Sequence, residues 1–167
     1  LTVEEVSALA RAGACDSLGL SRRQALWAAG TAATERAGML PGTSTVSTPA
    51  LPGMSAFELA AADISATGVT SEGHPVRLLR ARLDAWPGNF PVVPASGLLS
   101  VENGRRILVA GVVTHRQRPM TAGGVTFLGM EDETGLVNVM VSPGLWRARR
   151  RVATTSRMLM VRGIVQN

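Results

Sequence analysis

The chain has 167 residues, enough for one or two small domains, and 46% of them are hydrophobic, which suffices for a packed core. All 17 basic residues are arginine and face 12 acidic ones, so the formal net charge of +5 favours polyanionic partners. A single cysteine excludes an internal disulfide, and the two histidines give no zinc-ligand spacing. The sequence shows no signal peptide and no apolar run of the ~18 residues that a membrane span needs. We therefore expect a cytoplasmic location.

Residues 1–37 are predicted to form two helices around a tight turn. A capping box at Thr2 opens the first helix, and a second capping box at Ser21 opens the other. The turn between them, GACDSLGL, contains two glycines. This pattern predicts a helix–turn–helix and, more narrowly, a helix-hairpin-helix. Because the first residue is leucine, we expect the chain to be part of a longer protein.

The next part of the chain is predicted to be a linker followed by a helical connector. Residues 38–54, GMLPGTSTVSTPALPGM, are uncharged and rich in Pro, Gly, Ser and Thr, which predicts a flexible linker. Residues 55–103 form the connector. A capping box at Ser55 opens one helix, and His74 precedes Pro75 as the cap of another.

From residue 104 the apolar pattern changes to a period of two, which is typical of strands. The pattern predicts a helix over 143–153 and strands over 106–116, 125–131, 136–142 and 157–166. This order is that of an OB-fold, a five-stranded barrel with a helix between its third and fourth strands. A fifth strand is not contained in the chain. Residues 104–167 are therefore predicted to be a truncated OB-fold domain, and the fold class is α+β.

Three motifs resemble, in the same order, parts of the bacterial C-family DNA polymerases, of which the polymerase III alpha subunit is the type. VEEVSALARAGACDSLGLSRRQALW resembles the second half of their tandem helix-hairpin-helix module, and TGVTSEGHPVRLLRARL the linker before their OB domain. RILVAGVVTHRQRP and GVTFLGMEDETGLVNVMV resemble that OB domain. SRRQALW, LPGMSAFELAAAD and THRQRP are most similar to the error-prone type, which acts in damage-induced mutagenesis and translesion synthesis.

The resemblance implies the C-terminal, DNA-binding region of such a DNA-directed polymerase. The catalytic region and its divalent metal would lie upstream; we expect no catalytic residue, metal or cofactor in this segment, which has no counterpart of the family's palm aspartates. The implied partners are single-stranded template, duplex DNA and accessory mutagenesis proteins. The family's clamp-binding motif would lie near residues 48–57, but LPGMSAF has no glutamine, which argues against direct sliding-clamp binding.

The hairpin is the first predicted DNA site. In helix-hairpin-helix modules, backbone N–H groups of the turn and the second helix N-terminus hold a DNA phosphate. The predicted contacts to duplex DNA are Gly13, Ala14, Gly19, Arg22 and Arg23. The alternative is that Gly13 merely ends a helix and that the arginines are solvated, and Asp16 in the turn works against phosphate binding.

The second and third strands are expected to form the outer groove of the barrel. On the third strand, alternation turns the valines inward and the residues between them outward: Leu136, Asn138 and Met140. On the second strand, similarity to anticodon-binding OB domains places Leu128 and Met130 inside and turns the alternate residues to the groove.

Phe127 is predicted to stack on a splayed base, and Asn138 to hydrogen-bond a base edge. The loop after the first strand, HRQRPMTAGG, is predicted to contact phosphate through a polar tip that includes His115. The predicted single-strand site is therefore Phe127, Asn138, Met140, Arg116, Arg118 and Gln117. The alternatives are that Phe127 belongs to the core and that the loop is only solvated.

The helix WRARRRVATTSR is densely basic. Leu145 and Val152 are predicted to pack inward. The arginines are expected to be solvated; the alternatives are a partner surface, formed by Arg147, Arg150 and Arg151, or a non-specific DNA patch. The alternative function for the chain is accordingly a protein-interaction module that docks an accessory mutagenesis subunit, with DNA contact incidental. An anticodon-binding domain of a tRNA synthetase would share the OB motif but not the upstream hairpin.

Overall fold

The computed structural model describes residues 1–34, 38, 47–71 and 73–166. The chain divides into two compact units, Leu1–Glu72 and Gly73–Asn167. The predicted connector, 55–103, is thus shared between the units. Residues 39–46 of the predicted linker lie outside the described residues.

The first unit is helical and contains α1 (Val3–Arg11), the 3₁₀ turn η1 (Asp16–Leu18), α2 (Arg22–Ala32) and α3 (Ala56–Thr67). Each helix begins at the predicted capping box, in which a hydroxyl of Thr2, Ser21 or Ser55 accepts from the amide three residues later. These three predicted starts are confirmed. Small buried residues at the contacts, Ala10, Ala25 and Ala29, allow the helices to approach closely.

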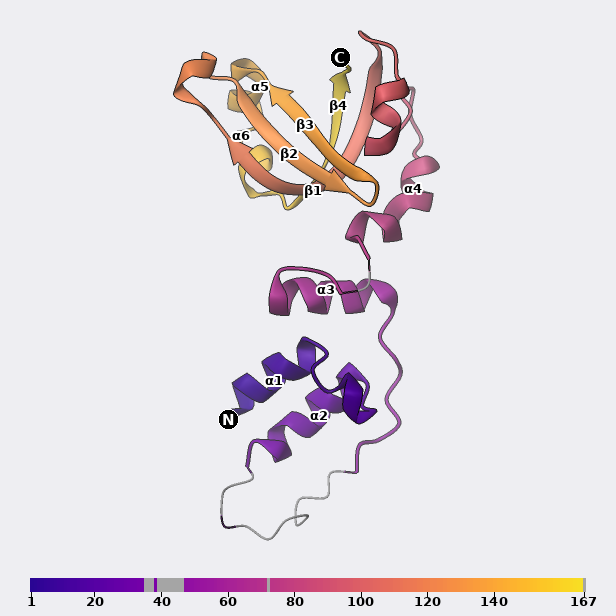
Figure 1. Cartoon of the computed structure of the whole chain (residues 1–167), viewed down its shortest axis with the longest axis vertical. Helices are drawn as coiled ribbons and strands as arrows, with labels where there is room; N and C mark the ends of the chain where they lie inside the picture. The colour runs from indigo at the N-terminus through magenta and orange to yellow at the C-terminus, as the bar shows by residue number, and fades with distance from the viewer. Residues whose placement is uncertain (35–37, 39–46, 72, 167) are drawn as a thin grey trace. The chain divides into compact units, whose positions relative to one another are not determined.

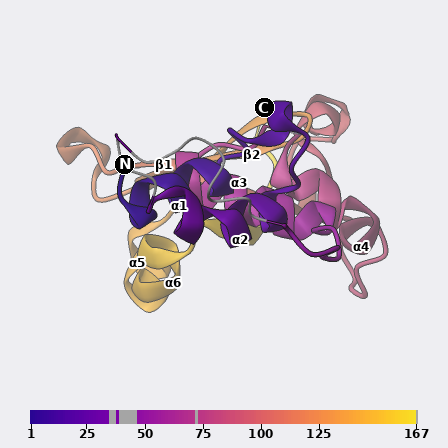
Figure 2. The same ribbon diagram turned by 90° about the horizontal axis from the view of Figure 1, so that it is seen from below.

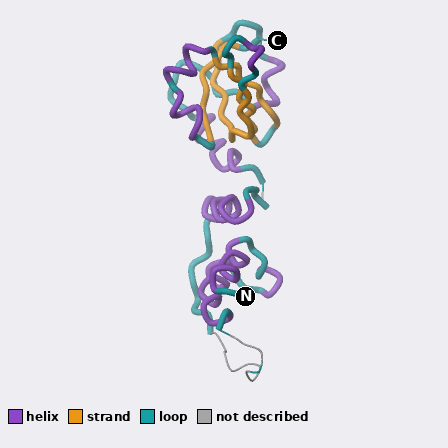
Figure 3. The backbone as a smooth tube through the Cα atoms, turned by 90° about the vertical axis from the view of Figure 1, so that its left-hand side faces the viewer, coloured by secondary structure: helices purple, strands orange, loops and turns teal. Residues whose placement is uncertain are grey.

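The second unit contains every strand among the described residues (Figure 3). Its elements are η2 (Pro75–Leu79), α4 (Arg80–Asp84), η3 (Ala95–Ser100), β1 (Arg106–Gln117), η4 (Met120–Ala122), β2 (Thr126–Asp132), β3 (Gly135–Val141), α5 (Pro143–Ala148), α6 (Arg150–Thr155) and β4 (Met158–Ile164). The four strands form one antiparallel sheet of order β3-β2-β1-β4, which is curled (Figure 1). The α+β class is confirmed, and the curled sheet is compatible with an OB-fold.

One face of the sheet carries the core, which consists of Ile107, Val109, Leu128, Met130, Val137 and Val141. Gly111 lets β1 and β2 lie close together, because a Cβ at this position would stand 2.8 Å from the Glu131 carbonyl oxygen. The register of β1 against β2 shifts between Val113 and His115, which marks a β-bulge. Between the edge strands β3 and β4 the curled sheet leaves a cleft of about 380 Å³ lined by core-facing residues such as Val139 and Val161.

The helix predicted over 143–153 is broken into α5 and α6, which lie together in Figure 2. The break falls at Arg149, whose φ of −120° and ψ of 22° are not helical. Trp146 packs against the core, and Ala153 is buried. The prediction that Leu145 and Val152 pack inward is wrong, because these side chains are 49% and 50% exposed.

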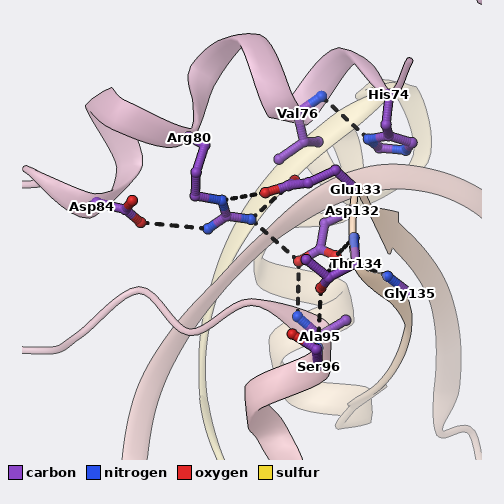
Figure 4. A network of polar contacts seen from close by, with 10 residues as sticks. All are labelled: His74, Val76, Arg80, Asp84, Ala95, Ser96, Asp132, Glu133, Thr134 and Gly135. Carbon is purple, nitrogen blue, oxygen red and sulfur yellow. Dashed lines mark hydrogen bonds and ion pairs between the residues drawn. The ribbon is translucent and has the colours of Figure 1, made fainter.

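A polar network ties the connector to the β2–β3 turn (Figure 4). Arg80 donates to Glu133 Oε1 at 2.5 Å and to Asp132 Oδ2 at 3.3 Å. The buried carboxylate of Asp132 also accepts from the amides of Ala95 at 2.8 Å and Thr134 at 2.7 Å. Burial by itself would raise the pKa of Asp132, but these hydrogen bonds and the Arg80 charge hold that pKa below its ordinary value.

His74 caps η2, the first element of the second unit. Its Nδ1 accepts from the Val76 amide at 3.2 Å, at the start of the 3₁₀ turn that opens with Pro75. The predicted capping role of His74 is confirmed.

Candidate nucleic-acid interface

The outer face of the sheet is built from residues that alternate with the core residues. Cross-strand pairing places Phe127 of β2 between Gln117 of β1 and Met140 of β3. In the next row, Gly129 of β2 lies between His115 and Asn138. Paired residues share a face of the sheet, so these two rows form one surface on the side opposite the core.

The predicted orientations on β2 and β3 are confirmed. Leu136, Asn138 and Met140 are exposed, whereas Leu128 and Met130 are buried. Phe127 is half-buried on the outer face and is not a member of the core cluster, so the alternative of a core phenylalanine is not favoured. Contact of these residues with DNA stays a prediction.

The bulge in β1 brings two further residues to this face. Before the bulge, odd-numbered residues such as Ile107 and Val109 face the core. After the one-residue shift, His115 and Gln117 pair with outer-face positions and belong to the sheet instead of the loop tip. This placement differs from the predicted loop tip. The signal for it in the sequence is Gly129, since a glycine inside a strand indicates a close approach.

Arg116 faces the core side of the sheet, so the prediction that it belongs to the single-strand site is corrected. Its cross-strand partner is the buried Leu128. Its Nε donates to the Ala153 carbonyl at 2.7 Å, and its Nη2 donates to the Ser156 carbonyl. The guanidinium therefore satisfies carbonyls at the C-terminal end of α6, where a cation also complements the helix dipole. Arg118 remains exposed in the following loop.

The backbone donors predicted at the hairpin already have partners. The amide of Gly13 donates to the Ala10 carbonyl at 3.2 Å, and that of Ala14 donates to the Leu9 carbonyl at 3.1 Å. The amide of Gly19 donates to the Asp16 carbonyl at 3.0 Å. A backbone N–H carries one hydrogen, so a phosphate held here would have to replace these bonds.

Arg22 and Arg23 hold α3 against the hairpin. The Arg22 side chain is 8% exposed and forms an ion pair with Asp63, whose own side chain is 6% exposed. Arg23 is 33% exposed and pairs with Glu58 at 2.6 Å. Burial by itself would raise the pKa of Asp63, but hydrogen bonds from Ser71 and the Arg22 charge lower that pKa. The prediction that Arg22 contacts phosphate is therefore corrected, because its guanidinium is buried and paired with Asp63 inside the first unit.

The arginine side chains of α5 and α6 form a solvent-exposed basic surface. Arg147, Arg150 and Arg151 are exposed, as the sequence indicated. The half-exposed Leu145 and Val152 lie among them, so the surface is both cationic and apolar.

Neither a metal centre nor a membrane span is found in the described part of the chain. No group of three or more His, Cys, Asp and Glu side chains is placed to hold a metal ion there. Over the same residues, no helix combines the length and the apolar character that crossing a bilayer requires.

The element order of the second unit is compatible with an OB-fold. Three antiparallel strands, a helical segment and a fourth strand follow one another, and an outer face carries aromatic and polar side chains. This class of fold binds oligonucleotides on the face that its second and third strands form.

Comparison with known proteins gives the relationship. Proteins called error-prone DNA polymerase match the whole chain, with 64% identity over 168 residues in Corynebacterium efficiens and 62% over 167 residues in Corynebacterium glutamicum. The protein of that name in Mycobacterium tuberculosis is 56% identical over 168 residues. The chain spans 15–16% of the length of these relatives. No family model matches the chain. The chain is therefore related over its full length to a segment of the error-prone DNA polymerases, and the resemblance stated from its motifs is confirmed.

Proposed function

We propose that this chain is a DNA-handling segment of an error-prone DNA polymerase and that the outer face of β1–β3 holds the single-stranded template. The observation that carries this proposal is the two-row outer face. Phe127 offers an aromatic ring, Asn138 an amide and Met140 an adaptable apolar side chain, on one sheet surface opposite the core. On this proposal, polymerisation, translesion synthesis and the divalent metal that they need would belong to other parts of the polymerase.

The expected binding mode reads little sequence. A base stacked on Phe127 would contribute about 1–3 kcal/mol, and any base has a face that can stack. Asn138 would donate to or accept from one base edge. Arg118 would contact phosphate, a contact that carries no sequence information and weakens with salt. This combination suits a surface that guides template of any sequence.

The hairpin contributes less to DNA binding than its motif suggests. Its turn amides are bonded within the hairpin, and Arg22 is paired inside the unit. Arg23 keeps a third of its side chain exposed and is the residue of the predicted set through which we propose a duplex phosphate contact. Such a contact would compete with Glu58.

A second candidate function is the docking of an accessory mutagenesis protein. It rests on α5 and α6, where Leu145 and Val152 are half exposed beside Arg147, Arg150 and Arg151. An acidic partner with apolar side chains would complement this surface.

Fluorescence anisotropy tests the first function against the second. A labelled strand of ~20 nucleotides exceeds the ~4–16 nucleotide site of an OB-fold and is titrated with the chain at several salt concentrations. We expect salt-dependent binding that Phe127→Ala and Asn138→Ala weaken and that Leu145→Ala, the matched control, leaves unchanged. Binding that ignores Phe127 and Asn138 but falls with Arg150→Ala would favour the docking surface as the site of incidental DNA contact.

A further inference from the structure

We propose that His115, seated on Gly129, is a second base-stacking platform beside Phe127. The proposal rests on the function proposed above and extends it to a residue that the OB motif did not indicate. Its ligand is an unpaired nucleobase in a single strand, the next one along from the base on Phe127.

Gly129 has no side chain, which leaves room for the His115 ring to lie on the strand at this position. A Cβ built on this glycine would lie 2.5 Å from both Nδ1 and Nε2 of His115, with Cε1 also among its nearest neighbours. All three ring atoms lie over the glycine, so the imidazole presents one face to the sheet. Gly129 is buried beneath it, whereas His115 is exposed. The other face of the ring is therefore open to solvent, which is the arrangement that stacking on a base requires.

Thr114, the bulged residue, fixes the ring from the side. Its hydroxyl donates to the Gly129 carbonyl at 3.2 Å and lies 3.1 Å from His115 Nδ1. The hydrogen bond between the Thr114 hydroxyl and Nδ1 runs in the direction that the histidine tautomer sets, and in either direction it holds the edge of the ring.

The spacing on the sheet suits consecutive bases. His115 pairs with Gly129, and Phe127 lies two residues from that glycine on the same strand and face. Such diagonal neighbours stand about 7–8 Å apart, a distance that a stretched single strand can span between adjacent bases. Asn138 pairs with Gly129 from the other side and stands ready for a base edge at the same row.

Four single variants of the 167-residue chain, with the His115→Ala/Gly129→Ala double variant and Phe127→Ala for comparison, test the platform with two oligonucleotides. His115→Ala removes the ring, whereas His115→Phe keeps a flat ring and removes the nitrogens. Gly129→Ala displaces the ring, because the added Cβ overlaps it. Gly144→Ala is the matched control, since a Cβ there meets nothing within 4 Å. One single strand carries an anisotropy label, and the other carries 2-aminopurine, whose fluorescence is quenched on stacking. Circular dichroism confirms that each variant is folded.

The expected result is a loss of affinity of roughly five- to a hundredfold for His115→Ala and for Gly129→Ala, with weaker 2-aminopurine quenching. Combining the two changes should cost little more than either alone, because both remove the same ring. His115→Phe should retain most of the binding, and Gly144→Ala all of it. If Phe127→Ala weakens binding while His115→Ala and Gly129→Ala do not, the platform is refuted and the proposed function stands. If the unaltered chain binds no single strand at low salt, both are refuted.

Discussion

Replacing Asp63 by alanine tests the role of Arg22 most sharply. The two side chains form an ion pair 41 residues apart in sequence, at 8% and 6% exposure. Asp63 also accepts from the Ser71 amide at 2.8 Å and from its hydroxyl at 2.7 Å. Removing the carboxylate leaves a buried guanidinium that donates to the Arg11 and Leu59 carbonyls, at 3.3 and 3.4 Å, and has lost its counter-charge.

The magnitude follows from that burial. Removing one partner of a buried ion pair costs about 3–5 kcal/mol, since the remaining charge is left uncompensated. The matched control is Arg23→Ala, which removes the more exposed pair with Glu58 in the same unit. The loss expected there is about 1 kcal/mol or less.

Hydrogen–deuterium exchange read by mass spectrometry separates the two units. Amides of α1–α3 should lose protection by roughly a hundred- to several-thousandfold in Asp63→Ala, or exchange without protection if the unit is less stable than that. Strands of the second unit should exchange unchanged. Equal effects of Asp63→Ala and Arg23→Ala on α1–α3 would refute the structural role that we assign to Arg22.

Further predictions concern the second unit and acid stability. Asp132→Ala should destabilise the second unit by roughly 3 kcal/mol, because the amides of Ala95 and Thr134 lose their acceptor and Arg80 loses one of its carboxylate partners while it keeps Glu133. Hydrogen exchange of η3 and the β2–β3 turn measures this loss. Gly111→Ala should disrupt β1–β2 pairing, since its Cβ would meet the Glu131 backbone, whereas Gly163→Ala, with open space, should not; thermal melts followed by circular dichroism compare the two. The folded pKa values of Asp63 and Asp132 are lowered, so the stability that these carboxylates contribute is complete above the ordinary pKa of 3.8 and is lost as the pH falls below it. In an acid titration of folding stability, the Asp132→Asn variant should therefore lose less stability than the unaltered chain. Arg116→Ala should raise exchange at the end of α6 by about tenfold, through the loss of hydrogen bonds worth roughly 1.5 kcal/mol, and should leave strand affinity nearly unchanged.

Features that depend on neighbouring residues could be predicted from the sequence. The capping boxes at Thr2, Ser21 and Ser55 join residues three positions apart, so they can be recognised without knowing the fold. The inward and outward sides of β3 follow from alternation alone, which is why Asn138 was placed correctly.

Features that depend on residues far apart in the sequence could not be predicted from it. The pairing of Arg22 with Asp63 joins two helices, and no local pattern marks it; a solvated arginine and a buried one look alike in sequence. The network of Arg80 with Glu133 spans 53 residues in the same way.

Backbone irregularities account for the remaining errors. The bulge after Val113 shifts every later residue of β1 to the other face, so His115 and Gln117 join the groove and Arg116 leaves it. The break at Arg149 rotates α6 relative to α5, which exposes Val152. A single inserted or non-helical residue carries little sequence signal, yet it decides which side chains a ligand meets.

Template binding on the outer face of β1–β3 is tested most directly by an NMR titration of the isotope-labelled chain with a single-stranded oligonucleotide of ~10 nucleotides, within the site size of one OB-fold. We expect the largest amide shifts on Phe127, Gly129 and Asn138, with smaller ones in the loop that holds Arg118. Shifts confined to α5 and α6, or to the hairpin of the first unit, would contradict it.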